Sequence, residues 1–228
     1  MQNNSNNKIR LILTGATGMV GEGVLHECLQ NDAISKILII NRKPAGMTHP
    51  KLKEIIHSDF HDLSPIEKEL VNYHGCLFCL GVSSVGMKEA EFYRLTYGLT
   101  MHVAETLSKL NADMVFCYIS GAGTDSSEKG KSMWARVKGK TENDLMKLPF
   151  KKVYNFRPGG LQPTKGLKNT LPYYKYLGWL LPIVKRIAPK YICTLKELGL
   201  AMINAVTNGY KKQVLEVPDI IALSREIH

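Results

Sequence analysis

The chain has 228 residues, of which 44% are hydrophobic and 22% are charged. This balance is typical of a folded globular protein and excludes wholesale disorder. Thirty Lys and Arg residues against 20 Asp and Glu residues give a formal net charge of +10, which favours a ligand that carries phosphate. The basic residues form no block of five or six, so we expect a nucleotide rather than a nucleic acid as the partner.

Short β-branched runs alternate with longer helical patterns over the first two thirds of the chain. We predict strands over residues 8–14, 36–41, 54–59, 76–80, 114–120 and 152–156, and helices over residues 20–30, 64–73, 88–110 and 133–147. Strands that alternate with helices in this way are typical of βαβ units with right-handed crossovers. The sequence therefore predicts an α/β fold with a doubly wound parallel sheet, the Rossmann type.

The chain changes in character after residue 157, where prolines and glycines interrupt the regular pattern. We expect a single domain over residues 1–228 that includes a small C-terminal helical cap on the substrate side, over residues 164–206. The centre of this cap, residues 173–186, is apolar, aromatic and basic, but it is too interrupted to cross a bilayer. A dimer contact or a weak membrane-surface contact is the alternative to a cap there. A last helix over 195–206 and a possible edge strand over 213–217 follow.

A glycine-rich turn lies between the first predicted strand and the first predicted helix, with glycines at positions 15, 18 and 21. A side chain in the tight turn would block a pyrophosphate, and one at the third glycine would hold the helix off the strand. The helix would then direct its free N–H groups and the positive end of its dipole at the phosphates. We therefore predict a dinucleotide site at Gly15, Thr17, Gly18, Met19, Val20 and Gly21.

The end of the second predicted strand distinguishes NADP(H) from NAD(H). Proteins that bind NAD place an acidic residue there to hold the ribose 2′-hydroxyl, whereas this chain has Asn41, Arg42 and Lys43. No carboxylate in this run repels a 2′-phosphate, and an arginine binds phosphate in a bidentate manner. The run favours NADP(H) over NAD(H), and a merely solvated loop is the alternative.

Together these motifs resemble those of the short-chain dehydrogenase/reductase superfamily, in its atypical branch of NAD(P)H-binding, NAD-dependent epimerase/dehydratase-like proteins. Besides the glycine turn, the resemblance is carried by Ser58-Asp59, Leu80-Gly81, Ser120-Gly121, Lys138 and Arg157-Pro158-Gly159. It implies that Asp59 and the backbone that follows, at Phe60, hold the adenine. It also implies that Leu80, Gly81 and Val82 line the cofactor, and that the turn at Pro158 and Gly159 borders the nicotinamide.

The resemblance also implies a catalytic set. In active members, a Tyr four residues before a Lys moves a proton, the Lys lowers the pKa of the Tyr and binds the nicotinamide ribose, and a Ser polarises the carbonyl. Ser120 and Lys138 match this pattern, but Trp134 stands at the Tyr position. An indole N–H only donates a hydrogen bond. A tyrosine from elsewhere could replace the missing one, and the candidates are Tyr93, Tyr97, Tyr118 and Tyr154.

The sequence leaves three functions open. The first is an NADP(H)-binding oxidoreductase-like protein that reduces a small carbonyl or quinone-like compound by hydride transfer. The second is a non-catalytic NADPH-binding sensor or partner-binding module, in which case the chain is no enzyme. The third is a nucleoside-diphosphate-sugar epimerase-like enzyme, although the predicted cap is short for a sugar-nucleotide substrate domain.

The cysteines carry little functional information. Their number is five, and the polar start of the chain is unlike a signal peptide, so we expect a reducing, cytoplasmic setting. Cys76 and Cys79 are three residues apart on a predicted strand and would face opposite sides of the sheet. We interpret them as small buried hydrophobic residues and expect no metal site.

Overall fold

The computed structural model describes residues 8–170, 172, 174 and 186–226. Its main sheet has seven strands in the order β3-β2-β1-β4-β5-β6-β9, and all paired strands in it are parallel. The strands are β1 (Ile9–Thr14), β2 (Ile34–Asn41), β3 (Leu52–Ile56), β4 (Gly75–Phe78), β5 (Val115–Ile119), β6 (Lys152–Arg157) and β9 (Val214–Glu216). This doubly wound sheet is the predicted Rossmann fold.

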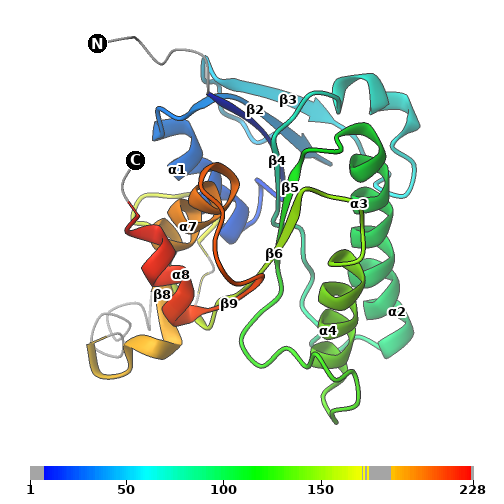
Figure 1. Ribbon diagram of the computed structural model, residues 1–228, viewed down its shortest axis with the longest axis vertical. Helices are drawn as coiled ribbons and strands as arrows, with labels where there is room; N and C mark the ends of the chain where they lie inside the picture. The colour runs from blue at the N-terminus through cyan, green and yellow to red at the C-terminus, as the bar shows by residue number, and fades with distance from the viewer. Residues whose placement is uncertain (1–7, 171, 173, 175–185, 227–228) are drawn as a thin grey trace.

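Helices cover both faces of the sheet (Figure 1). On one face lie α1 (Met19–Gln30), α7 (Leu195–Thr207) and α8 (Val217–Ser224), and on the other lie α2 (Glu89–Tyr93), α3 (Leu99–Leu110) and α4 (Met133–Leu145). Each face has its own hydrophobic cluster. Strands covered on both faces are apolar throughout rather than alternating, which explains why the runs of the sequence were sufficient to locate them.

The helix predicted over 195–206 forms, but it packs on the sheet rather than capping the cleft. Its contact with α1 is close because glycines face the partner helix on both sides. A Cβ added to Gly23 would lie 2.7 Å from Leu195, and one added to Gly199 would lie 2.9 Å from Glu27. Most of the central cap segment, residues 173–186, lies outside the described residues.

Other elements differ from the predictions where tertiary contacts override local pattern. The long helix predicted over 88–110 contains a π-helical turn, η2 (Arg94–Gly98), between α2 and α3, and the helix predicted over 64–73 is a short 3-10 helix, η1 (Ser64–Glu69). The pattern gave no sign of α8 or of the small parallel pair β7 (Gly160–Gln162) and β8 (Ile192–Thr194). A 3-10 helix, η3 (Pro189–Tyr191), lies directly before β8. None of the helices in the described ranges has the length and apolar content that crossing a bilayer requires.

Candidate functional site

The glycine turn connects β1 to α1 and contains two positions where no side chain fits. Gly15 has a φ of +76°, and a Cβ added there would lie 2.7 Å from the carbonyl oxygen of Cys79. A Cβ added to Gly21 would lie 2.1 Å from the carbonyl oxygen of Gly15. Both glycines therefore allow the turn and the helix to pack closely, as the spacing of the motif requires.

The middle glycine, Gly18, faces open space. It is exposed, and the nearest neighbour of an added Cβ would be the oxygen of Gly15 at 3.5 Å. Gly18 is also the N-cap of α1 and supplies no side-chain hydrogen bond to the helix, so the first N–H groups of the helix remain available. Bare backbone and free N–H groups at a helix start suit a phosphate, and the residues present fit the diphosphate of a dinucleotide.

A cavity of about 190 Å³ lies beside the carboxyl ends of β2 and β4. It gathers residues from four separate segments of the chain: Arg42, Ser58, Asp59, Phe60, His61, Leu80, Gly81, Val82, Arg94, Leu95 and Leu99. Six of the residues predicted to contact the cofactor therefore meet in one place. Lys43 is exposed and does not line this cavity. Arg94 was not predicted, and it reaches the cavity from the π-helical turn η2, where the helix departs from regular geometry.

Glu54 of β3 fixes the loop that carries Arg42. One carboxylate oxygen, Oε1, accepts hydrogen bonds from the side-chain amide of Asn41 at 2.8 Å and from the backbone N–H of Ala45 at 2.9 Å. A carboxylate thus does lie near the end of β2 in space, although the sequence run contains none. Its Oε1 is directed at the protein, where it binds both ends of the loop.

Ser120 follows β5 and is buried, with 5% of its surface exposed. Its Oγ lies 2.5 Å from Oε1 of Glu142 and 3.1 Å from the carbonyl oxygen of Phe156. Both neighbours are acceptors and a serine hydroxyl has one proton, so this proton stays inside the protein. The predicted role of Ser120 as a donor that polarises a substrate carbonyl does not fit this geometry.

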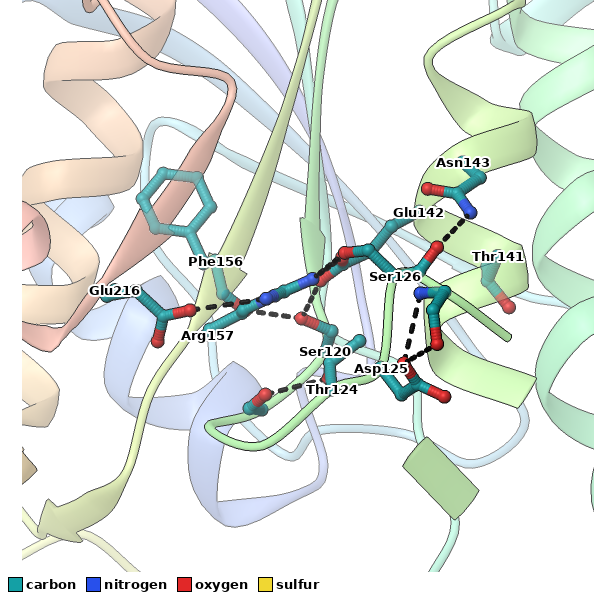
Figure 2. Close-up of polar contacts among 12 residues, drawn as sticks. Ser120, Thr124, Asp125, Ser126, Thr141, Glu142, Asn143, Phe156, Arg157 and Glu216 are labelled. Carbon is teal, nitrogen blue, oxygen red and sulfur yellow. Dashed lines mark hydrogen bonds and ion pairs between the residues drawn. The ribbon is translucent and has the colours of Figure 1, made fainter. Parts of the chain in front are cut away.

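Glu142 and Arg157 form a buried ion pair beside Ser120 (Figure 2). The side chain of Glu142 is 0% exposed and that of Arg157 is 11% exposed. Arg157 donates through Nε to Glu142 at 3.0 Å and through Nη2 to both Glu142 and Ser126, the latter at 2.6 Å, while Nη1 donates to Glu216 at 3.2 Å. One guanidinium thus joins α4, the loop after β5 and the end of β9, and its pKa is raised chiefly by the hydrogen bonds to Glu142.

Lys138 of α4 donates from Nζ to the carbonyl oxygen of Ser120. Burial lowers the pKa of Lys138 to about 8, against a smaller raising effect of the Glu142 carboxylate. The ammonium therefore lies at the carboxyl end of β5. Glu142 follows Lys138 by one helical turn, so the i, i+4 spacing could have indicated from the sequence that the two share a face.

Trp134 lies against the glycine loop that follows β5. Carbons of its indole ring would be 3.8 Å from a Cβ added to Gly121 and 3.7 Å from one added to Gly123. The next turn of the loop packs more closely still on α4, where a Cβ on Gly139 would be 1.8 Å from the oxygen of Asp125. The indole thus packs on the backbone beside the site and supplies no group for proton transfer.

The four candidate tyrosines are held in contacts of their own in the described part of the chain. The hydroxyl of Tyr97 donates to Asp144 at 2.9 Å, and the ring of Tyr93 stacks on Tyr97. Tyr118 is buried in the sheet, and burial raises the pKa of its hydroxyl. The hydroxyl of Tyr154 is bonded to the backbone of Tyr210, at the start of β6 and far from the carboxyl edge.

The turn after β6 closes the site from the other side. The carbonyl of Pro158 accepts from the N–H of Ala122 at 2.8 Å, which joins this turn to the loop after β5. Gly159 is packed so closely that an added Cβ would lie 2.3 Å from the oxygen of Tyr191. Pro158 and Gly159 therefore border the same edge of the sheet as Ser120.

None of the five cysteines takes part in a disulfide within the described chain. Burial raises the pKa of Cys76 and Cys79, which disfavours the reactive thiolate. Within the described ranges, no three His, Cys, Asp or Glu side chains are grouped so that they could hold a metal ion.

Comparison with known proteins identifies relatives over much of the chain. Residues 11–133 match the model of the NAD dependent epimerase/dehydratase family. The mitochondrial protein FMP52-1 of Scheffersomyces stipitis is 26% identical over 69% of this chain and 71% of its own length, and FMP52 of Candida albicans, also mitochondrial, is 28% identical over 70% and 72%. These names contradict the cytoplasmic setting expected above. That expectation was wrong because free cysteines report a reducing environment and do not specify a compartment.

Solved structures share the fold. A short chain dehydrogenase family protein from Francisella tularensis has a TM-score of 0.61 and 16% identity, covering 88% of this chain and 92% of its own. The ADP-L-glycero-D-manno-heptose-6-epimerase of Helicobacter pylori has a TM-score of 0.66 and 13% identity, covering 99% and 84%. With the glycine turn, the cavity at β2 and β4 and the family match all in one Rossmann domain, this chain belongs to the NAD dependent epimerase/dehydratase family.

Proposed function

We propose that the chain binds NADP(H) at the carboxyl edge of its sheet and is an oxidoreductase whose acceptor is quinone-like. The observation that carries the proposal is the cavity at β2 and β4, where Arg42 and Arg94 lie together with Asp59, Leu80 and Gly81. Two guanidinium groups at the adenosine end suit the extra phosphate of NADP(H). Glu54, the acidic residue near the end of β2, has Oε1 turned toward Asn41 and Ala45.

We infer the class of hydride acceptor from the residues at the β5 end of the site, where no described side chain is placed to donate a proton. A simple ketone needs a proton donor as hydride reaches its carbon, yet Trp134 replaces the tyrosine and Ser120 directs its proton at Glu142. NADPH, when bound, supplies the hydride. A quinone accepts the hydride and is reduced to a hydroquinone anion, which takes its proton from water. The indole of Trp134, which packs against the backbone of Gly121 and Gly123, is an apolar aromatic group beside this end of the site.

The second candidate is a non-catalytic NADPH-binding module. It is favoured by the same buried contact, because a serine whose proton is held by Glu142 is better suited to stiffening the loop than to catalysis. The two candidates predict the same cofactor affinity and differ only in turnover.

The cofactor preference is tested by replacing both Arg42 and Lys43 with alanine and titrating NADPH and NADH by their fluorescence. We expect the affinity for NADPH to fall about 10-fold or more, roughly 1.4 kcal/mol per factor of ten, and the affinity for NADH to change by less than about twofold. Substitution of two other exposed lysines, Lys109 and Lys147, provides the charge-matched control. Equal losses for both cofactors would refute the 2′-phosphate assignment.

Turnover is measured as NADPH consumption with a panel of quinones and a panel of aldehydes and ketones. Oxidation of NADPH with quinones and not with the carbonyl compounds is the expected result. Binding without turnover on either panel would eliminate the oxidoreductase and leave the binding module.

A further inference from the structure

The glycine turn has no side-chain cation to balance the charge of a diphosphate. A nucleotide diphosphate carries two negative charges, yet residues 14–21 contain no cation, and the first charged residue after them is Glu22. The helix dipole contributes only about half an elementary charge at its start. A cation from another part of the chain would compensate the charge that remains.

Glu22 binds a segment that is distant in the sequence. It is buried, with 7% of its surface exposed, and both of its carboxylate oxygens are occupied. Oε1 accepts from the backbone N–H of Lys168 at 2.9 Å, and Oε2 accepts from that of Asn169 at 2.7 Å. The segment of residues 165–170, which we call the strap, is thereby attached to α1 at two adjacent backbone groups.

The attachment point lies beside the start of the helix. Glu22 is three residues after Met19, the first residue of α1, which is about 4.5 Å along the axis at 1.5 Å per residue. Side chains in a helix tilt toward its N-terminus, so the carboxylate and the backbone of Lys168 lie nearer still to the turn. Lys168 is exposed, and its flexible four-carbon stem lets the ammonium move from that point.

We propose that the strap supplies the Lys168 ammonium to the diphosphate of the bound dinucleotide, and that Glu22 positions the strap for this contact. The inference rests on the proposed NADP(H) site and assigns a residue to its phosphate end. The carboxylate of Glu22 thus has a function beside the phosphate site, because it binds the backbone N–H groups of the strap and brings the Lys168 ammonium to the diphosphate.

Three ligands distinguish the contact with the diphosphate from the contact with the 2′-phosphate. ADP has the diphosphate without a 2′-phosphate, adenosine 2′-monophosphate has the reverse, and NADPH has both. For Lys168→Ala we expect the affinities for NADPH and ADP to fall by roughly 3- to 10-fold, the range of a charge-assisted contact, with a smaller loss at high salt. The affinity for adenosine 2′-monophosphate should stay unchanged. Arg42→Ala should show the opposite pattern between the two adenosine ligands.

Lys109→Ala removes the same charge from the last turn of α3, at the opposite edge of the sheet, and should leave all three affinities unchanged. If Lys168→Ala and Lys109→Ala bind ADP and NADPH equally well while Arg42→Ala weakens NADPH, the strap assignment is wrong and the proposed function stands. If the unmodified protein binds neither NADPH nor NADH, the proposed function itself fails.

A measurement without ligand tests the positioning role. Glu22→Gln keeps the size of the side chain but turns an NH₂ group toward a backbone N–H, so one attachment is lost. Hydrogen exchange of residues 165–170 should become faster by about 10-fold, and ADP affinity should fall as it does in Lys168→Ala. Unchanged exchange and unchanged ADP affinity in a folded Glu22→Gln protein would overturn the role of Glu22.

Discussion

Replacing Arg157 with methionine should destabilise the protein far more than any change to an exposed ion pair. The substitution keeps most of the apolar stem but leaves the carboxylate of Glu142, which is 0% exposed, without its cation. Breaking a buried pair in this way costs about 3–5 kcal/mol because an uncompensated charge remains in the interior. For a chain of 228 residues, about 2–4 °C per kcal/mol converts this into a fall in Tm of roughly 6–20 °C.

Glu142→Gln should cost less, about 1–3 kcal/mol. Arg157 then keeps Ser126 and Glu216 as partners, and its side chain is 11% exposed. The difference in stability loss between Arg157→Met and Glu142→Gln therefore reflects how deeply the remaining charged group is buried, because both variants remove the same ion pair. Lys53→Met, which removes one partner of the exposed pair Lys53–Glu69, is the control and should change stability by less than about 1 kcal/mol.

The assay is urea unfolding followed by circular dichroism, with the double variant Glu142→Gln, Arg157→Met included. The double variant should be more stable than Arg157→Met alone, since the unpaired charge is removed with its partner. If the two single losses are equal, or if they add in the double variant, the buried charge is not what makes Arg157 important.

Two further predictions concern the glycine turn and Lys138. Gly21→Ala should destabilise the fold by about 1–3 kcal/mol, as overpacking does, because its Cβ would lie 2.1 Å from the oxygen of Gly15. Gly18→Ala should instead preserve stability in urea and weaken NADPH binding. A larger loss of stability in Gly18→Ala than in Gly21→Ala would refute our assignment of Gly18 to the open face. The folded-state pKa of Lys138 is lowered by burial to about 8, so the unfolded chain, with a lysine pKa near 10.4, holds more protons between about pH 8 and pH 10. Stability should rise with pH in this window, and the rise should be smaller in Lys138→Met when unfolding is measured at pH 7.5, 9 and 10; identical profiles would contradict the buried ammonium.

The fold was predictable because the strands are apolar on both faces and the helices between them are amphipathic. The interruptions were not predictable from local pattern. The π-helical turn at Arg94–Gly98 lies inside a continuous helical pattern, and the β7–β8 pair joins segments about thirty residues apart through three residues each. Such short elements depend on the surrounding packing, which no periodicity records.

The candidate site also has a part that the sequence predicts and a part that it does not. The glycine spacing and six residues of the β2–β4 cavity could be predicted from the sequence, because these residues follow predicted strands and all parallel strands end at one edge. Arg94 could not, because it lies in the π-helical turn. The direction of the Ser120 hydroxyl could not, since it depends on Glu142, which lies 22 residues further along the chain. The attachment of Lys168 to Glu22 spans 146 residues and has no sequence signal.

The charges of the carboxyl edge explain why cofactor and acceptor would be bound by different means. At the β2–β4 end, Arg42 and Arg94 line a cavity. At the β5–β6 end the charges are matched within the protein, because Arg157 is bonded to two glutamates and Lys138 to a backbone carbonyl. Under the proposed function, the side chain beside an acceptor at that end is the indole of Trp134, which packs on glycine backbone. An indole contributes apolar area and no proton for acid–base transfer, so a flat ring that accepts hydride without a proton donor suits that end better than a simple ketone.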